Sequence, residues 1–153
     1  MTDANIWSNE WGEQGPDWSG GGGLGKRLVP PGPFLGASVY EFERGNFMVF
    51  HFHHGSDELL IVLRGTPTLR TFDGERVLEE GEVVPFPAGR AGAHEIRNDT
   101  DETVRFVVAG TRVSPEVAEY PDLGQVTAQS REPNQKGEPL FIIHSLDEPQ
   151  PSA

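Results

Sequence analysis

The stretch that decides the fold reads Gly45-Asn-Phe-Met-Val-Phe-His51-Phe-His53-His54-Gly-Ser-Asp-Glu58, and it closes on Gly65. Residues 47–53 are rich in strand-forming side chains, and alternate residues of a strand face the same side of a sheet. His51 and His53 therefore point one way, whereas His54 points the other way. A turn over residues 55–57 can return the Glu58 carboxylate to the face of the first two imidazoles.

A second stretch reads Gly81-Glu-Val-Val-Pro-Phe-Pro87-Ala-Gly89-Arg-Ala-Gly-Ala-His94-Glu-Ile-Arg-Asn98. It brings His94 from a later strand. Three imidazoles and one carboxylate can occupy four positions of an octahedron and leave two positions open to water or a substrate. A purely structural zinc site would usually be closed, tetrahedral and rich in thiolates, and the chain has no cysteine. These residues predict a site for one divalent metal ion, and iron, manganese, nickel and zinc all accept such ligands.

Several nearby residues have alternative interpretations. Asp57 could replace Glu58 as the carboxylate ligand. His54 and His144 fit surface or packing roles. Asn98 fits a residue that stabilises a turn or contacts a metal-binding side chain better than a residue that binds the metal itself. Arg70 could bind a substrate carboxylate if it faced the interior, but a solvated surface arginine is the simpler interpretation. Three further positions are expected to be turn glycines with positive φ: Gly65, Gly81 and Gly89.

The surrounding sequence predicts an all-β fold. Residues 35–112 contain many short strands separated by turn signals, including the apolar run Leu59–Leu63, which fits a buried strand. Residues 1–34 are expected to form an irregular N-terminal arm, because they combine three tryptophans with glycine and proline runs. The arm could cover its own domain or a neighbour, or close over the site. Residues 113–153 are expected to be an extension with a helical turn over 113–120, a loop over 122–138 and a possible final strand at 139–145.

The two stretches resemble the motifs of the cupins. The first motif is G(X)5HXH(X)3–4E(X)6G, and Gly45, His51, His53, Glu58 and Gly65 match its fixed positions. The second is G(X)5PXG(X)2H(X)3N, which the chain matches with four residues rather than two between Gly89 and His94. The resemblance covers about residues 36–112. It implies a double-stranded β-helix, or jelly roll, with metal ligands His51, His53, Glu58 and His94, and it implies a homodimer.

Composition narrows the partners. The formal net charge of −12 disfavours nucleic acid and anionic membrane surfaces. No apolar stretch approaches the roughly 18 residues that span a bilayer. The absence of cysteine and of a signal-peptide pattern at the first residues favours a cytoplasmic location. We therefore expect a small-molecule ligand, and an anionic ligand would need the metal or a local arginine.

The sequence leaves the function open between different classes. An open-sided metal favours an enzyme, with dioxygenase, isomerase and decarboxylase chemistry all compatible. The alternative is a non-catalytic module that binds a sugar or carboxylate, and a third interpretation is an assembly scaffold with a structural metal. No catalytic or substrate-binding residue can be assigned from the sequence.

Overall fold

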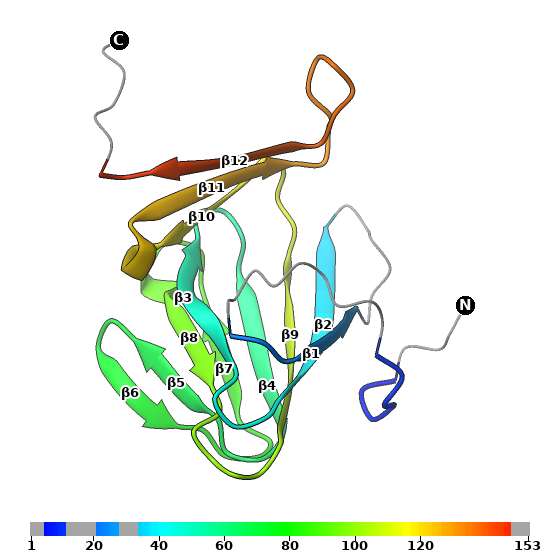
Figure 1. Ribbon diagram of the computed structural model, residues 1–153, viewed down its shortest axis with the longest axis vertical. Coiled ribbons are helices and arrows are strands. Elements are labelled where there is room, and N and C mark those ends of the chain that lie inside the picture. Colours follow the sequence, from blue (N-terminus) through cyan, green and yellow to red (C-terminus); the bar gives the residue numbers. More distant parts are fainter. Residues whose placement is uncertain (1–4, 12–20, 28–33, 148–153) are drawn as a thin grey trace.

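The computed structural model describes residues 5–11, 21–27 and 34–147, which form two antiparallel β-sheets (Figure 1). The first sheet comprises, in spatial order, β1 (Leu24–Arg27), β2 (Leu35–Phe42), β9 (Val104–Thr111), β4 (Glu58–Arg64) and β7 (Val83–Phe86). The second comprises β12 (Leu140–Ser145), β11 (Gln125–Ser130), β10 (Glu116–Tyr120), β3 (Phe47–His53), β8 (His94–Arg97), β5 (Thr68–Thr71) and β6 (Gly74–Val77). This architecture confirms the predicted all-β jelly roll.

Helical structure is minor. Within the described ranges it is limited to two 3-10 turns, η1 (Arg90–Gly92) and η2 (Pro121–Leu123). No helix in the part of the chain that the structure covers is long and apolar enough to cross a membrane.

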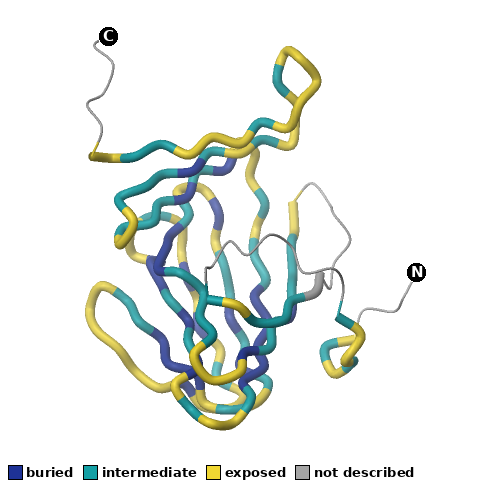
Figure 2. Tube along the Cα trace, in the orientation of Figure 1, coloured by how far each residue is buried: buried dark blue, intermediate teal, exposed yellow. Residues whose placement is uncertain are grey.

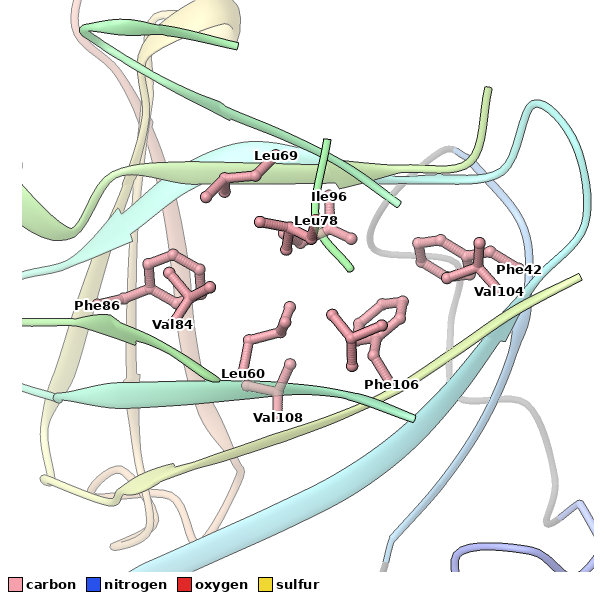
Figure 3. Packing of buried hydrophobic residues seen from close by; sticks show 11 residues of the cluster. Phe42, Leu60, Leu69, Leu78, Val84, Phe86, Ile96, Val104, Phe106 and Val108 are labelled. Atoms are coloured by element: carbon pink, nitrogen blue, oxygen red, sulfur yellow. The ribbon is translucent and has the colours of Figure 1, made fainter. Parts of the chain in front are cut away.

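The core lies between the two sheets, as Figure 3 shows at close range. It is built by side chains from both layers: Phe42, Leu60, Val62, Leu69, Leu78, Val84, Phe86, Ile96, Val104, Phe106 and Val108. In β4, Leu60 and Val62 are buried, whereas the alternate residues of this strand are half-buried. The run Leu59–Leu63, which was predicted to be a buried strand, is therefore fully buried on one face only. The other face of the antiparallel sheet turns outward.

The C-terminal region differs from the prediction. Residues expected to form a helical turn form β10, and part of the expected loop forms β11, which pairs with β10 along its length. β12 lies where a final strand was thought possible. These three strands extend the sheet of β3 beyond the barrel (Figure 1). β10 and β11 were missed because their residues are largely polar or small and only partly buried (Figure 2).

Part of the N-terminal arm is attached to the barrel. β1 pairs with β2 inside the segment expected to be irregular. Arg105 of β9 is only 2% exposed. Its guanidinium donates to the Ile6 carbonyl oxygen at 3.2 Å and to Asn9 Oδ1 at 2.6 Å. Its guanidinium also lies 5.1 Å from the centre of the Trp11 ring. Residues 5–11 therefore lie against the chain's own barrel, whereas Trp18 falls outside the described residues.

Candidate metal centre

The pairing of β3 with β8 brings three histidines together. His51 lies directly opposite His94, so their side chains project from the same face of the sheet. Their ring centroids are 4.6 Å apart. His53 follows on the same face, with its ring centroid 5.1 Å from that of His51. Strand parity had predicted this common orientation of His51 and His53.

The second motif carries two extra residues, and they form a compact turn. Residues 90–92 make η1, and the backbone N–H of Gly89 donates to the His53 carbonyl oxygen at 2.7 Å. Gly89 has a φ of 87°, as expected for a turn glycine. The loop is thereby anchored to the end of β3, and His94 enters β8 opposite His51.

Glu58 reaches the histidines from the other sheet. It begins β4 and lies opposite Gly110 of β9. A Cβ atom on Gly110 would lie 2.9 Å from Glu58 Cγ and 2.7 Å from the Asp57 carbonyl oxygen, so only glycine leaves room for this side chain. Glu58 Oε2 lies 3.4 Å from His53 Nε2 and 3.6 Å from His94 Nε2.

The spacing of these atoms is compatible with a shared ion. One ligand atom from each of His51, His53 and Glu58 lies within 4.8 Å of the others. Two donors that each lie about 2.1 Å from one ion are about 3 Å apart when adjacent and about 4.2 Å apart when opposite. The three residues could therefore hold a metal ion after small side-chain movements.

Two of the imidazoles are oriented by the same local hydrogen bond. His51 Nδ1 lies 2.8 Å from the Val49 carbonyl oxygen, and His94 Nδ1 lies 2.8 Å from that of Gly92. A carbonyl oxygen can only accept, so each Nδ1 carries the hydrogen. In the neutral rings, the Nε2 lone pairs are then available to a metal, which is how metal-binding histidines are commonly oriented.

His94 lies outside the compact group of His51, His53 and Glu58, but its Nε2 offers a separate sign of a cation site. The His94 side chain is 1% exposed, and the Phe86 ring stacks on it at 3.7 Å between centroids. Its Nε2 is buried and has no hydrogen-bond partner, which is rare for a buried polar atom. This lone pair faces a carboxylate oxygen of Glu58, so two electron donors face each other. A cation between them would satisfy both.

The charges of the site follow from burial and from the Glu58 carboxylate. Burial lowers the pKa of His51 to about 3, with further lowering by His94 and His53, and burial also lowers the pKa of His94. Burial opposes the charged form of His53 as well, but the hydrogen bond and charge of Glu58, with Glu116, outweigh it and raise the His53 pKa. Against its own desolvation, Glu58 has a lowered pKa because of His53. In the metal-free protein, the Glu58 carboxylate therefore favours the protonated form of His53.

Glu116 is a site residue that the sequence did not reveal. It lies on β10, its Oε1 is 3.4 Å from His53 Nδ1, and its Oε2 accepts a hydrogen bond from the Ser56 hydroxyl. Both Oε1 and His53 Nδ1 are buried without another partner. A carboxylate behind a metal-binding imidazole fixes the orientation of the ring. Glu116 could have been predicted as a site residue only if β10 had been recognised as a strand that pairs with β3.

The alternative ligands lie outside the group. Asp57 Oδ1 accepts from the backbone N–H of Ala88 at 2.7 Å, and the compact ligand group contains Glu58 instead. His54 lies 3.3 Å from Glu119 and its side chain is about half exposed. Asn98 donates to the carbonyl oxygens of Phe42 and Glu102 and so stabilises a turn.

Arg70, the arginine considered as a substrate clamp, is paired elsewhere. It forms ion pairs with Glu95 and Asp122 and lies over the Phe50 ring.

A cavity of about 310 Å³ opens beside the candidate centre. His53, Glu58 and Glu116 line one wall, and residues 111–114 with 129–131 line the remainder. This volume lies at the lower end of the range of roughly 300–1,000 Å³ for small-molecule sites. The open side of the candidate centre therefore faces a space large enough for a small organic molecule.

The ring charges can be tested by nitrogen NMR of the metal-free protein. At about pH 6, which lies above the His51 pKa of about 3 and just below the ordinary histidine pKa of ~6.5, His51 should be neutral with hydrogen on Nδ1. His53 should be positively charged, because its pKa is raised. Addition of Zn²⁺ should remove the His53 proton. The variant His53→Gln assigns the signal, and a charged His51 at this pH would contradict the assignment.

Comparisons with known proteins agree with the fold. Residues 38–110 match the family model described as a cupin domain. No curated protein matches the chain significantly. A structure from Acidithiobacillus ferrooxidans, provisionally assigned as a sugar phosphate isomerase, shares 25% identity with a TM-score of 0.70 and covers 86% of this chain and 81% of its own. A cupin-superfamily sugar phosphate isomerase from Silicibacter pomeroyi shares 29% identity with a TM-score of 0.66, covering 78% and 73% respectively.

A more distant structure supports the fold alone. It is a polyketide cyclase from Streptomyces resistomycificus with 20% identity and a TM-score of 0.52, and it covers 58% of this chain and 64% of its own. The matched domain, the two-sheet barrel and the neighbouring structures agree with the resemblance carried by the sequence motifs. Residues 38–110 are therefore a cupin domain.

Proposed function

We propose that the chain binds one divalent transition metal ion, from among iron, manganese, nickel and zinc, through His51, His53, Glu58 and His94. We further propose that it is an enzyme that isomerises a small sugar or a related hydroxy-carbonyl compound. The observation that carries the metal proposal is the unpaired, buried Nε2 of His94, which faces the Glu58 carboxylate at 3.6 Å. The orientation of His51 by its own backbone supports the same ligand set.

The choice of isomerisation rests on the comparisons. Two structures with 25% and 29% identity, which cover most of this chain, carry the description sugar phosphate isomerase. The polyketide cyclase is too distant to support a reaction. An isomerisation of this kind moves a hydrogen between adjacent carbons and exchanges the carbonyl and hydroxyl groups, so it needs no external oxidant.

The residues of the chain have separate roles in this proposal. A bound divalent cation would polarise the carbonyl and hydroxyl oxygens of the substrate. The Val49 and Gly92 carbonyl oxygens orient the rings of His51 and His94. Glu116 positions His53 from behind, and the cavity wall beyond Glu116 encloses the remainder of the substrate.

An activity assay with restored metal tests the enzyme. The protein is stripped with a chelator, reloaded separately with each of the four metals, and incubated with a panel of sugar phosphates and matched free sugars. Product detection by NMR should show interconversion that depends on the metal. Glu58→Gln should lower kcat/KM by more than about 100-fold, and Glu116→Gln by about 10- to 100-fold, as is typical for an outer partner of a ligand.

The matched control is Glu119→Gln, which alters a carboxylate of the same strand, β10, that pairs with His54 outside the ligand group. Its kcat/KM should remain near that of the wild type. Ligand-induced thermal shifts without any product would overturn the enzyme and favour the non-catalytic binding module. Product formation by fully metal-free protein would overturn the role of the metal.

The predicted homodimer has structural support in β12. This strand is an edge of the second sheet and projects beyond the barrel (Figure 1). Ile142 and Ile143 are 50% and 58% exposed although they point to opposite faces of the strand. Exposed apolar edge strands favour association with another chain unless charges protect them, and residues 140–145 contain no Asp, Glu, Lys or Arg. We propose that β12 contacts a second copy of the chain, while the cytoplasmic location stays a prediction.

Light scattering coupled to size-exclusion chromatography tests this interface. The wild type should elute as a dimer, and Ile143→Asp should elute as a monomer because a buried charge in the interface is costly. Val77→Asp is the matched control, since Val77 is 61% exposed on the edge strand β6 at the other end of the same sheet. A monomeric wild type, or a monomer produced equally by both substitutions, would contradict the assignment.

A further inference from the structure

The cavity beside the candidate centre is lined by side chains of both charges. The wall nearer the histidines contains the carboxylates of Glu58 and Glu116. The rest of the cavity is lined by the end of β9 with the loop that follows it, and by the end of β11. These two segments contribute Arg112 and Arg131. They lie side by side because β10 and β11 pair antiparallel after the loop that follows β9.

Arg112 differs from the ion-paired arginines that the structure describes. Arg70, Arg97 and Arg105 all form ion pairs with carboxylates. Arg112 is a half-buried residue that lines the cavity, and its guanidinium makes no hydrogen bond or ion pair with any residue that the structure describes. In a chain with a net charge of −12, carboxylates are abundant. Arg112 lines the cavity without pairing with a carboxylate, so its guanidinium is available to an anionic ligand.

Hydroxyl groups and a second guanidinium surround Arg112. Arg131 Nη2 lies 3.4 Å from the Arg112 carbonyl oxygen, and the Arg131 backbone N–H donates to Ser114 Oγ at 3.0 Å. Ser114 Oγ in turn lies 3.4 Å from Ser130 Oγ. All four residues line the cavity. Two guanidinium groups beside two hydroxyl groups provide the donors that oxyanions accept.

We propose that Arg112, Arg131, Ser114 and Ser130 form an oxyanion-binding subsite for a phosphate or carboxylate group of the substrate. The opposite end of that substrate would then reach His53 and Glu58. This inference rests on the proposed function, because the bound molecule is taken to be its substrate. It adds that the substrate has an anionic group. The arginines also explain how an acidic protein can attract an anion, because their local positive charge opposes the repulsion of the whole chain.

Binding of small probes tests the subsite in the protein as purified. Isothermal titration calorimetry would use inorganic phosphate first, and then glycerol phosphate, glycerate and glycerol. Phosphate and glycerol phosphate should bind, glycerol should not, and added salt should weaken binding. Arg112→Gln and Arg131→Gln should each weaken phosphate binding about tenfold or more, because a charge-assisted hydrogen bond is lost. Arg112→Lys should retain part of the affinity, since it keeps the charge and loses the fork.

The matched control is Arg76→Gln, which removes an arginine paired with Glu82 on the exposed strand β6. Phosphate affinity of this variant should stay within about twofold of the wild type. Comparison of glycerol phosphate with glycerate shows which oxyanion the subsite prefers. Arg131 is exposed, so its substitution provides a test even if Arg112→Gln fails to fold.

The outcomes separate the subsite from the proposed function. Absence of phosphate binding by the wild type at millimolar concentration, or equal binding by Arg131→Gln and Arg76→Gln, overturns the subsite. Metal content should be unchanged in both arginine variants. If the arginine variants lose phosphate binding and the wild type shows no isomerisation, the subsite is supported and only the proposed reaction is contradicted.

Discussion

The Glu58 carboxylate and the lone pair of His94 Nε2 face each other at 3.6 Å, and the rest of the site depends on this contact. Both groups are electron donors, because the Gly92 carbonyl oxygen accepts the hydrogen of His94 Nδ1 and because Glu58 has a lowered pKa. Such an arrangement is unfavourable unless positive charge lies nearby. A protonated His53 supplies it in the metal-free protein, and a divalent cation would supply it more completely.

The fold creates this contact by joining two sheets. β3 and β8 present the imidazoles, and β4 presents the carboxylate from the facing layer. The apolar core below the site holds the layers together (Figure 3). Phe86 connects the two parts, since it belongs to that core and also stacks on the His94 ring. The ligands are thus placed on packed strands, whereas the proposed oxyanion subsite uses a loop and strand ends.

The part of the site that the sequence could predict is the part encoded by local spacing. His51 and His53 share a face because strand residues alternate, and the resemblance to the cupins added Glu58 and His94. The longer spacing before His94 could be interpreted only with the structure, in which residues 90–92 form η1 and His94 lies opposite His51.

The residues that were missed lie on strands with weak local signals. The segment Glu116–Tyr120 has the composition of a helical turn, and tertiary pairing with β3 and β11 overrides that preference. Glu116 consequently reached His53 from a segment that the sequence placed outside the barrel. Arg112 and Arg131 are far apart in the sequence, and only the pairing of β10 with β11 brings them to one cavity.

X-ray absorption spectroscopy of the metal-loaded protein tests whether His51, His53, Glu58 and His94 bind one ion. We predict one ion per chain, with three imidazole nitrogens and one carboxylate oxygen at about 2.0–2.2 Å and water oxygens at the open positions. His94→Ala should reduce the imidazole contribution from three to two. An ion held by fewer than three imidazoles in the wild type, or a spectrum unchanged by His94→Ala, would contradict the assigned ligand set.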